Sequence, residues 1–256
     1  MALNKDSVLG TMVFVISLSL VCSFMITGTA EVLKERKLVK KRNELQQIVL
    51  SAAGVDSNAG NFQTLFADRV KPKLLTLETG ELSEQENILD FDERMAAINP
   101  ETSTKPKKDL AKIKRRANQV RVFEVYDESG KLSRLVLPIY GKGLWSILYG
   151  YVAIEPDFNT VGSITFYEHG ETPGIADFVT DPDWLGKWQG KQVFDNKGKV
   201  AIKVIKGGAK EGDVHGVDGV SGATRTGVGI QKAVHFWFGP EGYQPYLNQL
   251  ASAGGQ

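Results

Sequence analysis

Residues 120–141 read VRVFEVYDESGKLSRLVLPIYG, and this stretch decides the fold. Apolar residues alternate with polar ones on both sides of Asp127-Glu128-Ser129-Gly130, a pattern typical of two β-strands joined by a short turn. The following segments, WSILYGYVAIEP at 145–156 and VGSITFYEH at 161–169, have the same character. The sequence therefore predicts at least four strands that follow one another closely, as in an antiparallel sheet.

The C-terminal third adds a hairpin and a helix to this sheet. Residues 192–208, QVFDNKGKVAIKVIKGG, predict two strand segments turning at Asn196-Lys197-Gly198. After the glycine-rich stretch that ends at Gly229, apolar side chains recur at helical spacing, at Ile230, Ala233, Val234 and Trp237. We therefore expect residues 119–256 to form an α+β domain with an antiparallel sheet and flanking helices.

The N-terminal residues have a different character. Residues 8–26, VLGTMVFVISLSLVCSFMI, contain no charge and no proline, and as a helix they cover the roughly 30 Å of a bilayer core. A cleaved signal peptide is the alternative, with Lys5 as its charged start and residues 27–30 as the cleavage site. The apolar run exceeds the roughly 7–15 residues of a signal peptide, which favours a transmembrane anchor over residues 1–30.

Residues 31–118 separate the anchor from the predicted sheet. Leu33, Leu38 and Leu45 continue a helical pattern that Gly54 is expected to end. The rest alternates apolar and acidic clusters, which indicates an adapter region of short helices and loops. Residues 105–116 carry seven basic side chains, which suit either a solvated linker or a contact with anionic lipid or a partner protein.

Composition excludes several classes of function. The chain has 31 basic and 30 acidic residues, so it carries no overall positive charge for binding nucleic acid. Cys22 is the only cysteine, which excludes an internal disulfide and a cysteine-ligated iron–sulfur cluster. Neither G-x-G-x-x-G nor G-x-x-x-x-G-K-[ST] is present, and the three histidines have no metal-ligand spacing. We therefore predict no metal site.

Residues 218–224, DGVSGAT, form the most distinctive short segment. Small residues ahead of a helix leave backbone N–H groups and the positive end of the helix dipole accessible to a phosphate. The alternative is an ordinary glycine turn in which Thr224 or Thr226 caps the helix.

This segment resembles the flavinylation motif D-x-x-[ST]-G-A-T, in which a flavin transferase moves FMN from FAD onto the threonine as a phosphoester. Every specified position of the motif matches, at Asp218, Ser221, Gly222, Ala223 and Thr224. The resemblance implies FMN attached covalently to Thr224, with Thr226 as the fallback acceptor.

Two further segments resemble the FMN-binding domain of flavinylated subunits. Residues 169–174, HGETPG, match H-x-E-T-P-G, although Ile175-Ala176 stands where relatives often have Leu-Gly. Residues 141–145, GKGLW, match G-x-G-L-W. We expect the flavin ring to lie against these segments, with contacts from Gly143, Leu144, Trp145, Ser146, Glu171, Thr172, Gly174 and Ile175.

Together these features resemble the C subunits of sodium-translocating NADH:quinone oxidoreductases. The resemblance implies an FMN electron relay that is not catalytic alone. It would act within a complex of six subunits in the bacterial inner membrane, whose other members bind NADH, FAD and quinone. A flavin transferase would attach the FMN during maturation. The related G subunit of Rnf complexes shares the anchor and the flavinylation motif, but the long segment 55–118 favours a C subunit.

The expected sidedness rests on two conflicting signals. Six basic residues between Lys34 and Arg42 favour a cytoplasmic domain, whereas the resemblance implies a periplasmic one. We follow the resemblance, because long domains are translocated largely regardless of flanking charge.

Two functions of other classes remain open at this point. A non-redox, membrane-tethered protein would hold a phosphorylated ligand noncovalently in the small-residue loop. A hydrolase would use Ser221 or Thr224 as nucleophile, although the sequence has no G-x-S-x-G motif.

Overall fold

The computed structural model describes residues 7–56 and 61–253, and Lys5 and the C-terminal residue Gln256 lie outside these ranges. The chain divides into two compact units, Met1–Glu44 and Leu45–Gln256. Residues 45–118 therefore belong to the same compact unit as residues 119–256. The chain passes from one unit to the other after Glu44 and not after residue 118.

Helix α1 (Val8–Ala52) is continuous through both units. Within the described residues it is the one helix long and apolar enough to span a membrane. Apolar side chains of the first unit, such as Phe14 and Leu20, are exposed. The predicted end of this helix at Gly54 is confirmed. Helix α1 ends at Ala52, and Gly54 adopts the left-handed conformation that ends many helices (φ +73°).

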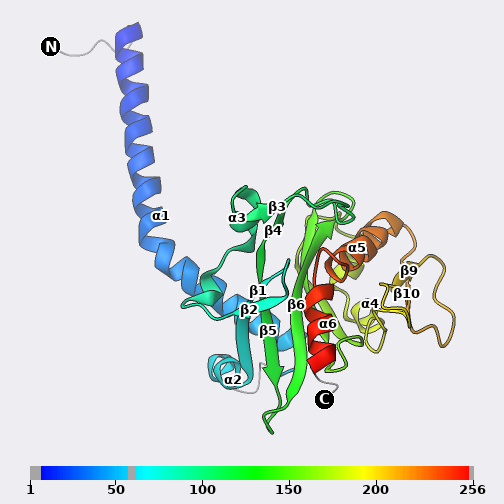
Figure 1. The fold of residues 1–256 in the computed structure, drawn as a ribbon. Helices are drawn as coiled ribbons and strands as arrows, with labels where there is room; N and C mark the ends of the chain where they lie inside the picture. The colour runs from blue at the N-terminus through cyan, green and yellow to red at the C-terminus, as the bar shows by residue number, and fades with distance from the viewer. Residues whose placement is uncertain (1–6, 57–60, 254–256) are drawn as a thin grey trace. The chain divides into compact units, whose positions relative to one another are not determined.

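In the described residues of the second unit, an antiparallel sheet of six strands has the order β2-β1-β5-β6-β7-β8 (Figure 1). The predicted α+β fold and its antiparallel sheet are confirmed. The strands are β1 (Val70–Thr76), β2 (Glu81–Ser83), β5 (Gln119–Tyr126), β6 (Leu132–Lys142), β7 (Ile147–Ile154) and β8 (Val161–Glu168).

Strands β1 and β2 were not predicted from the sequence. Two lysines and Pro72 interrupt the apolar pattern of β1, so its local sequence does not indicate a strand. It pairs along its whole length with β5, from Val70 opposite Val125 to Thr76 opposite Gln119. The neighbouring strand, far away in the sequence, therefore stabilises β1.

Four helical elements cover one face of the sheet: η2 (Asp177–Thr180), α4 (Pro182–Gly186), α5 (Thr224–Trp237) and α6 (Gln244–Ala253). Figure 1 shows α4, α5 and α6 on the same side of β6. Leu137 and Val152 of the sheet pack with Trp237 in the larger of two buried clusters. The indole Nε1 of Trp237 donates to the Tyr140 carbonyl at 2.7 Å, which fixes α5 on β6.

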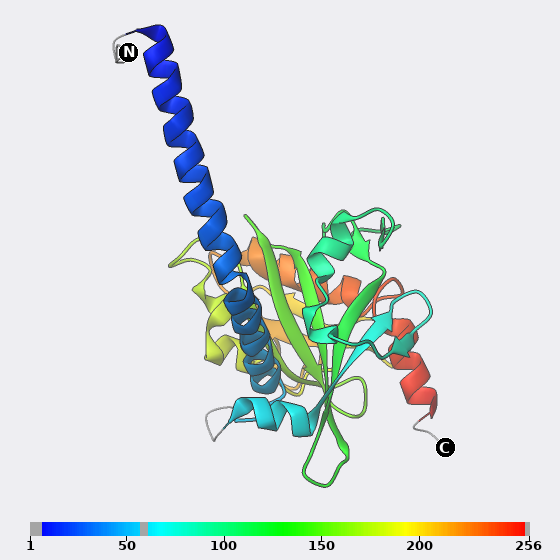
Figure 2. The ribbon, with the colours of Figure 1, turned by 90° about the vertical axis from the view of Figure 1, so that its left-hand side faces the viewer.

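The opposite face is covered by the last turns of α1, from Leu45, and by α2 (Phe62–Arg69) (Figure 2). Val49 and Leu50 of α1 pack with Phe123 and Tyr151, whose strand neighbours point to the first face. The Ser163 hydroxyl donates to the Ala52 carbonyl at the end of α1.

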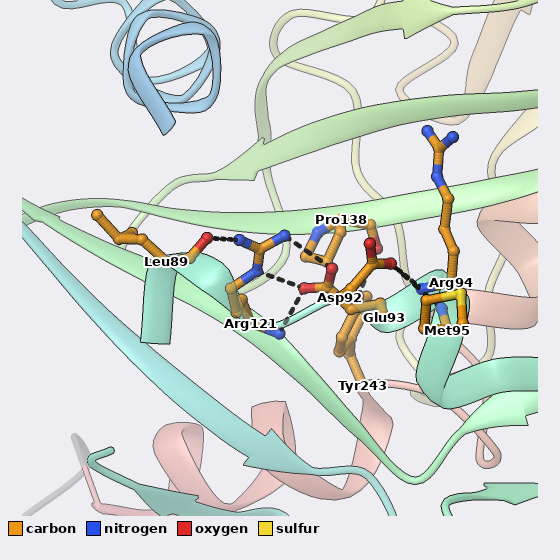
Figure 3. A network of polar contacts seen from close by, with 8 residues as sticks. All are labelled: Leu89, Asp92, Glu93, Arg94, Met95, Arg121, Pro138 and Tyr243. Carbon is orange, nitrogen blue, oxygen red and sulfur yellow. Dashed lines mark hydrogen bonds and ion pairs between the residues drawn. The ribbon is translucent and has the colours of Figure 1, made fainter. Parts of the chain in front are cut away.

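A buried ion pair fastens the short 3₁₀ turn η1 (Ile88–Asp90) and helix α3 (Glu93–Ile98) to β5 (Figure 3). Arg121 donates to the two carboxylate oxygens of Glu93 at 2.6 and 2.7 Å and to the Leu89 carbonyl at 2.6 Å. These bonds satisfy a guanidinium whose residue is only 8 % exposed.

The basic segment 105–116 is folded onto the domain. The N–H groups of Lys107 and Lys108 donate to the Glu241 carboxylate, and buried Arg116 donates to the Glu241 carbonyl. Arg116 and Ala117 form β4, which pairs with β3 (Ser103–Thr104). The interpretation as a solvated linker is therefore wrong for this segment.

The predicted hairpin at residues 192–208 forms only in part. Asp195 accepts N–H bonds from Lys197 and Lys199, so the turn is present, but its arms share a single bridge between Phe194 and Val200. The chain then forms β9 (Lys203–Ile205), which pairs in parallel with β10 (Gly216–Asp218). This long-range pairing replaces the hairpin ladder.

Candidate functional site

Three segments that are distant in the sequence enclose one cavity of about 210 Å³. They are the loop between β6 and β7, the loop after β8, and the start of α5. The cavity is lined by Leu144, Trp145, Glu171, Thr172, Ile175, Ala176, Gly222, Ala223, Thr224, Arg225 and Thr226. The structure thus brings together the three motifs that the sequence singled out.

The Glu171 carboxylate joins these segments. It accepts backbone N–H bonds from Leu144, Trp145 and Ser146, each at 3.0 Å. From α5 it accepts a hydrogen bond from the Thr226 hydroxyl at 2.6 Å. One side chain therefore sets the position of the β6–β7 loop relative to the first turn of α5.

Glu171 is ionised in this position. Its side chain is buried, with 5 % of the residue exposed. Burial by itself raises the pKa of the carboxyl, but the hydrogen bonds from Thr226 and from the N–H groups of Ser146, Trp145 and Leu144 outweigh burial and lower the pKa from its ordinary 4.5 to about 2. The site therefore contains a fixed negative charge at neutral pH.

Glu171→Gln tests these contacts of the Glu171 carboxylate through the pH dependence of stability. Because the folded pKa is depressed, the carboxylate stabilises the wild type above pH 4.5, and this stabilisation is lost as the pH falls towards 2. We expect Glu171→Gln to lower the free energy of unfolding at pH 7 by about 2 kcal/mol and to flatten its change between pH 4.5 and 2. Urea unfolding at several pH values measures both effects.

The matched control is Glu211→Gln, which changes an exposed carboxylate outside the cavity. The control is expected to keep the wild-type stability at pH 7. If the free energy of unfolding of Glu171→Gln changed between pH 4.5 and 2 as steeply as that of the wild type, the assigned role of the Glu171 carboxylate would be contradicted.

Thr224 is the first residue of α5, and its side chain is accessible. The preceding Gly222 has φ +83°, which favours glycine and turns the chain into the helix. Among the described residues, no acceptor is recorded for the N–H groups of Thr224, Arg225 and Thr226. The hydroxyl thus lies where three backbone donors and the helix dipole face outward.

The helix-cap alternative is wrong for both threonines. The N-cap residue is Ala223, and no side chain caps the helix. Thr226 is 2 % exposed and donates its hydroxyl to Glu171. Of the two threonine hydroxyls, that of Thr224 is therefore the accessible one.

Two residues of the flavinylation motif face away from the cavity. Asp218 accepts the Ala209 N–H at 2.7 Å and a bond from Lys187 at 3.0 Å, and both contacts lower the pKa of its carboxyl. Its carbonyl accepts the Trp184 Nε1–H at 2.7 Å. Asp218 thus fixes the entry to the motif loop, while Ser221 is exposed and does not line the cavity.

The remaining predicted residues support the cavity from its edges. Ser146 accepts the Gly170 N–H on its hydroxyl at 2.7 Å, and Gly174 donates its N–H to Asp177 at 2.9 Å. Gly143 packs against Glu171, since an added Cβ would lie 2.8 Å from Oε1.

Close packing of α5 on the end of β6 was not predicted. A Cβ on Gly229 would lie 2.4 Å from the Lys142 carbonyl oxygen. A side chain there would separate the helix from the loop that Glu171 holds. Gly229 is thus a site residue that the sequence did not reveal, and the only signal for it was its position beside the motif. Thr226 was named only as a cap or fallback acceptor, and its bond to Glu171 was not predicted.

The cavity has an exposed apolar rim. Trp145 is 64 % exposed and Ile175 is 57 % exposed. Apolar surfaces beside an accessible hydroxyl and unpaired N–H groups suit a ligand with a flat ring and a phosphate. The residues present therefore fit FMN.

Comparison with known proteins agrees with this fit. A family model described as an FMN-binding domain matches residues 143–239, which include the lining of the cavity. The C subunit of the Na(+)-translocating NADH-quinone reductase of Neisseria meningitidis is 42 % identical over 255 residues, covering 99 % of this chain and 98 % of the relative. The chain belongs to this family of C subunits. The relative from Vibrio alginolyticus is also 42 % identical, with 98 % of both chains covered.

Solved structures of this family show the same fold. The crystal structure of NqrC from Shewanella oneidensis matches with a TM-score of 0.81 and 64 % identity, over 84 % of this chain and 99 % of that one. The C subunit from Parabacteroides distasonis matches with a TM-score of 0.63 and 26 % identity, over 83 % and 94 % of the two chains.

Proposed function

We propose that this chain is the FMN-carrying electron relay of a sodium-translocating NADH:quinone reductase, with the FMN linked to Thr224 as a phosphoester. The observation that carries the proposal is the position of Thr224. Its accessible hydroxyl lies at the edge of a cavity that the three flavin-associated motifs enclose. Family membership supports the assignment to this reductase.

Several of the lining residues would hold the cofactor. The Thr224 hydroxyl provides the attachment point, and the N–H groups at the start of α5 face the phosphate. Leu144, Trp145 and Ile175 offer apolar surface to the ring, while Glu171 keeps the loop that carries the first two in place. When bound, FMN supplies transfer of one or two electrons at its ring.

The proposal includes partners and a location. The reductase would contain six subunits in the bacterial inner membrane, with the sites for NADH, FAD and quinone outside this chain. A flavin transferase would load Thr224, and α1 would anchor the chain in lipid with the flavin domain in the periplasm. The span in α1 supports the anchor.

The alternatives explain fewer observations. An Rnf-type G subunit is disfavoured because the match to C subunits extends over 98 % of their length. A hydrolase would need a base beside its nucleophile, and among the described residues no hydrogen bond joins Ser221 or Thr224 to a histidine or carboxylate. A noncovalent phosphate binder would release its ligand on denaturation, so its band in a denaturing gel would show no flavin fluorescence.

A kinetic test addresses the relay. In the assembled complex, NADH should reduce the flavin of this chain and quinone should re-oxidise it, each at a rate no slower than steady-state turnover. Stopped-flow absorbance spectroscopy measures these rates. Reduction or re-oxidation slower than turnover would place the flavin outside the electron path and contradict the relay.

A further inference from the structure

A second cavity of about 440 Å³ adjoins the first at Thr224. The two cavities share Leu144, Thr224 and Arg225. The second is lined by Leu110, Lys112, Lys142, Gly143, Leu144, Thr224, Arg225, Val228, Gly229 and Lys232.

The second cavity is strongly basic. It is lined by Lys112, Lys142, Arg225 and Lys232, and none of the described carboxylates lines it. The Lys142 ammonium donates to the Trp145 carbonyl at 2.5 Å. Within the described part of the chain, no ion pair is recorded for any of the four cations. Four cations around one space repel one another, and an anion bound among them would remove that cost.

These cations come from three separate parts of the chain. Lys142 ends β6, and its N–H donates to the Ala111 carbonyl at 2.8 Å, which places the neighbouring Lys112 beside it. Arg225 and Lys232 lie seven residues apart on α5 and so share one face of the helix. The folded basic segment, for which the proposed relay gives no role, thus supplies one wall of the cavity.

The two cavities offer opposite electrostatic environments to a phosphate at Thr224. The first cavity, which would hold the flavin ring and is called the ring cavity, contains the ionised Glu171 carboxylate, which repels an anion. The basic cavity offers four cations, of which only Arg225 also lines the ring cavity, and the N–H groups of Thr224 and Arg225 lie at the common edge of the two.

We propose that the basic cavity is a phosphate site that holds the phosphodiester of Thr224-linked FMN and binds inorganic phosphate when the flavin is absent. The first half rests on the proposed function, but the second does not. The site would hold the phosphate away from Glu171 while the ring occupies the neighbouring cavity.

Inorganic phosphate tests the site in the full-length Thr224→Val variant, which lacks the acceptor hydroxyl. We expect phosphate to raise its melting temperature saturably, and calorimetric titration to give the affinity. Adding Arg225→Gln and Lys232→Gln should weaken that affinity by about tenfold or more, because two charge-assisted contacts are lost. Neither side chain is part of the buried core, so the fold should remain intact, which circular dichroism checks.

Lys206→Gln with Lys210→Gln, two exposed lysines of the same domain, is the charge-matched control and should keep the affinity. Flavinylated wild type should bind no further phosphate, because the phosphate of its flavin already fills the site. Binding by the flavinylated chain would instead indicate a lipid headgroup or free phosphate as the natural occupant. Absent binding to Thr224→Val, equal losses in both double variants, or undiminished binding by the flavinylated chain would each overturn the proposal. If mass spectrometry instead finds wild-type Thr224 unmodified, the proposed function fails while the phosphate titration still decides the cavity.

Discussion

Thr224→Val is expected to yield a folded chain that carries no covalent flavin. The side chain of Thr224 is accessible, so the substitution removes a hydroxyl without opening a cavity in the core. The expected change in stability is within about 0.5 kcal/mol, as for most surface substitutions. The loss of flavin should be complete, and the absence of a fluorescent band for this chain in a denaturing gel measures it.

The matched control is Thr226→Val, which removes the other hydroxyl of the same turn. Because the Thr226 hydroxyl donates to Glu171, its loss should destabilise the fold by about 1–3 kcal/mol and leave the covalent flavin in place. A fluorescent band from Thr224→Val, or a band missing only from Thr226→Val, would assign the acceptor to Thr226.

The second large effect concerns the side of the membrane. Alkaline phosphatase fused after the C-terminal residue should be fully active, because this reporter matures only outside the cytoplasm. The basic residues that follow the apolar part of α1 favour the opposite orientation, but charge bias is weak for a domain of this length. The transferase proposed to load Thr224 must in turn reach the domain on the same side.

A fluorescent protein that matures only in the cytoplasm, fused at the same position, provides the complementary reporter and should stay dark. An inactive phosphatase fusion, together with fluorescence from the second reporter, would place the flavin domain in the cytoplasm. The count of basic residues would then have been the better guide.

Strands with regular alternation were predictable from sequence, and strands stabilised from elsewhere were not. Residues 120–141 alternate clearly, and they form β5 and β6 as expected. In β1, Pro72 and its flanking lysines hide the strand, which depends on pairing with β5. The short parallel pair of β9 and β10 also depends on contacts between distant segments, which the hairpin pattern at 192–208 does not reveal.

The site shows the same division. Local motifs indicated the residues around the cavity, because each motif lies on a loop next to a regular element. They did not show that Glu171 reaches Thr226, 55 residues later, or that Asp218 contacts Lys187 and faces away from the cavity. Such contacts depend on how the loops pack together, and one sequence does not contain that information.

Peptide mass spectrometry of the native chain tests the central claim most directly. After proteolysis, the peptide that contains Thr224 should be heavier than its sequence by one FMN less one water, and its fragment ions should place the addition on Thr224. An unmodified Thr224 peptide from a preparation whose flavin dissociates on denaturation would contradict the account, as would an addition placed on Thr226.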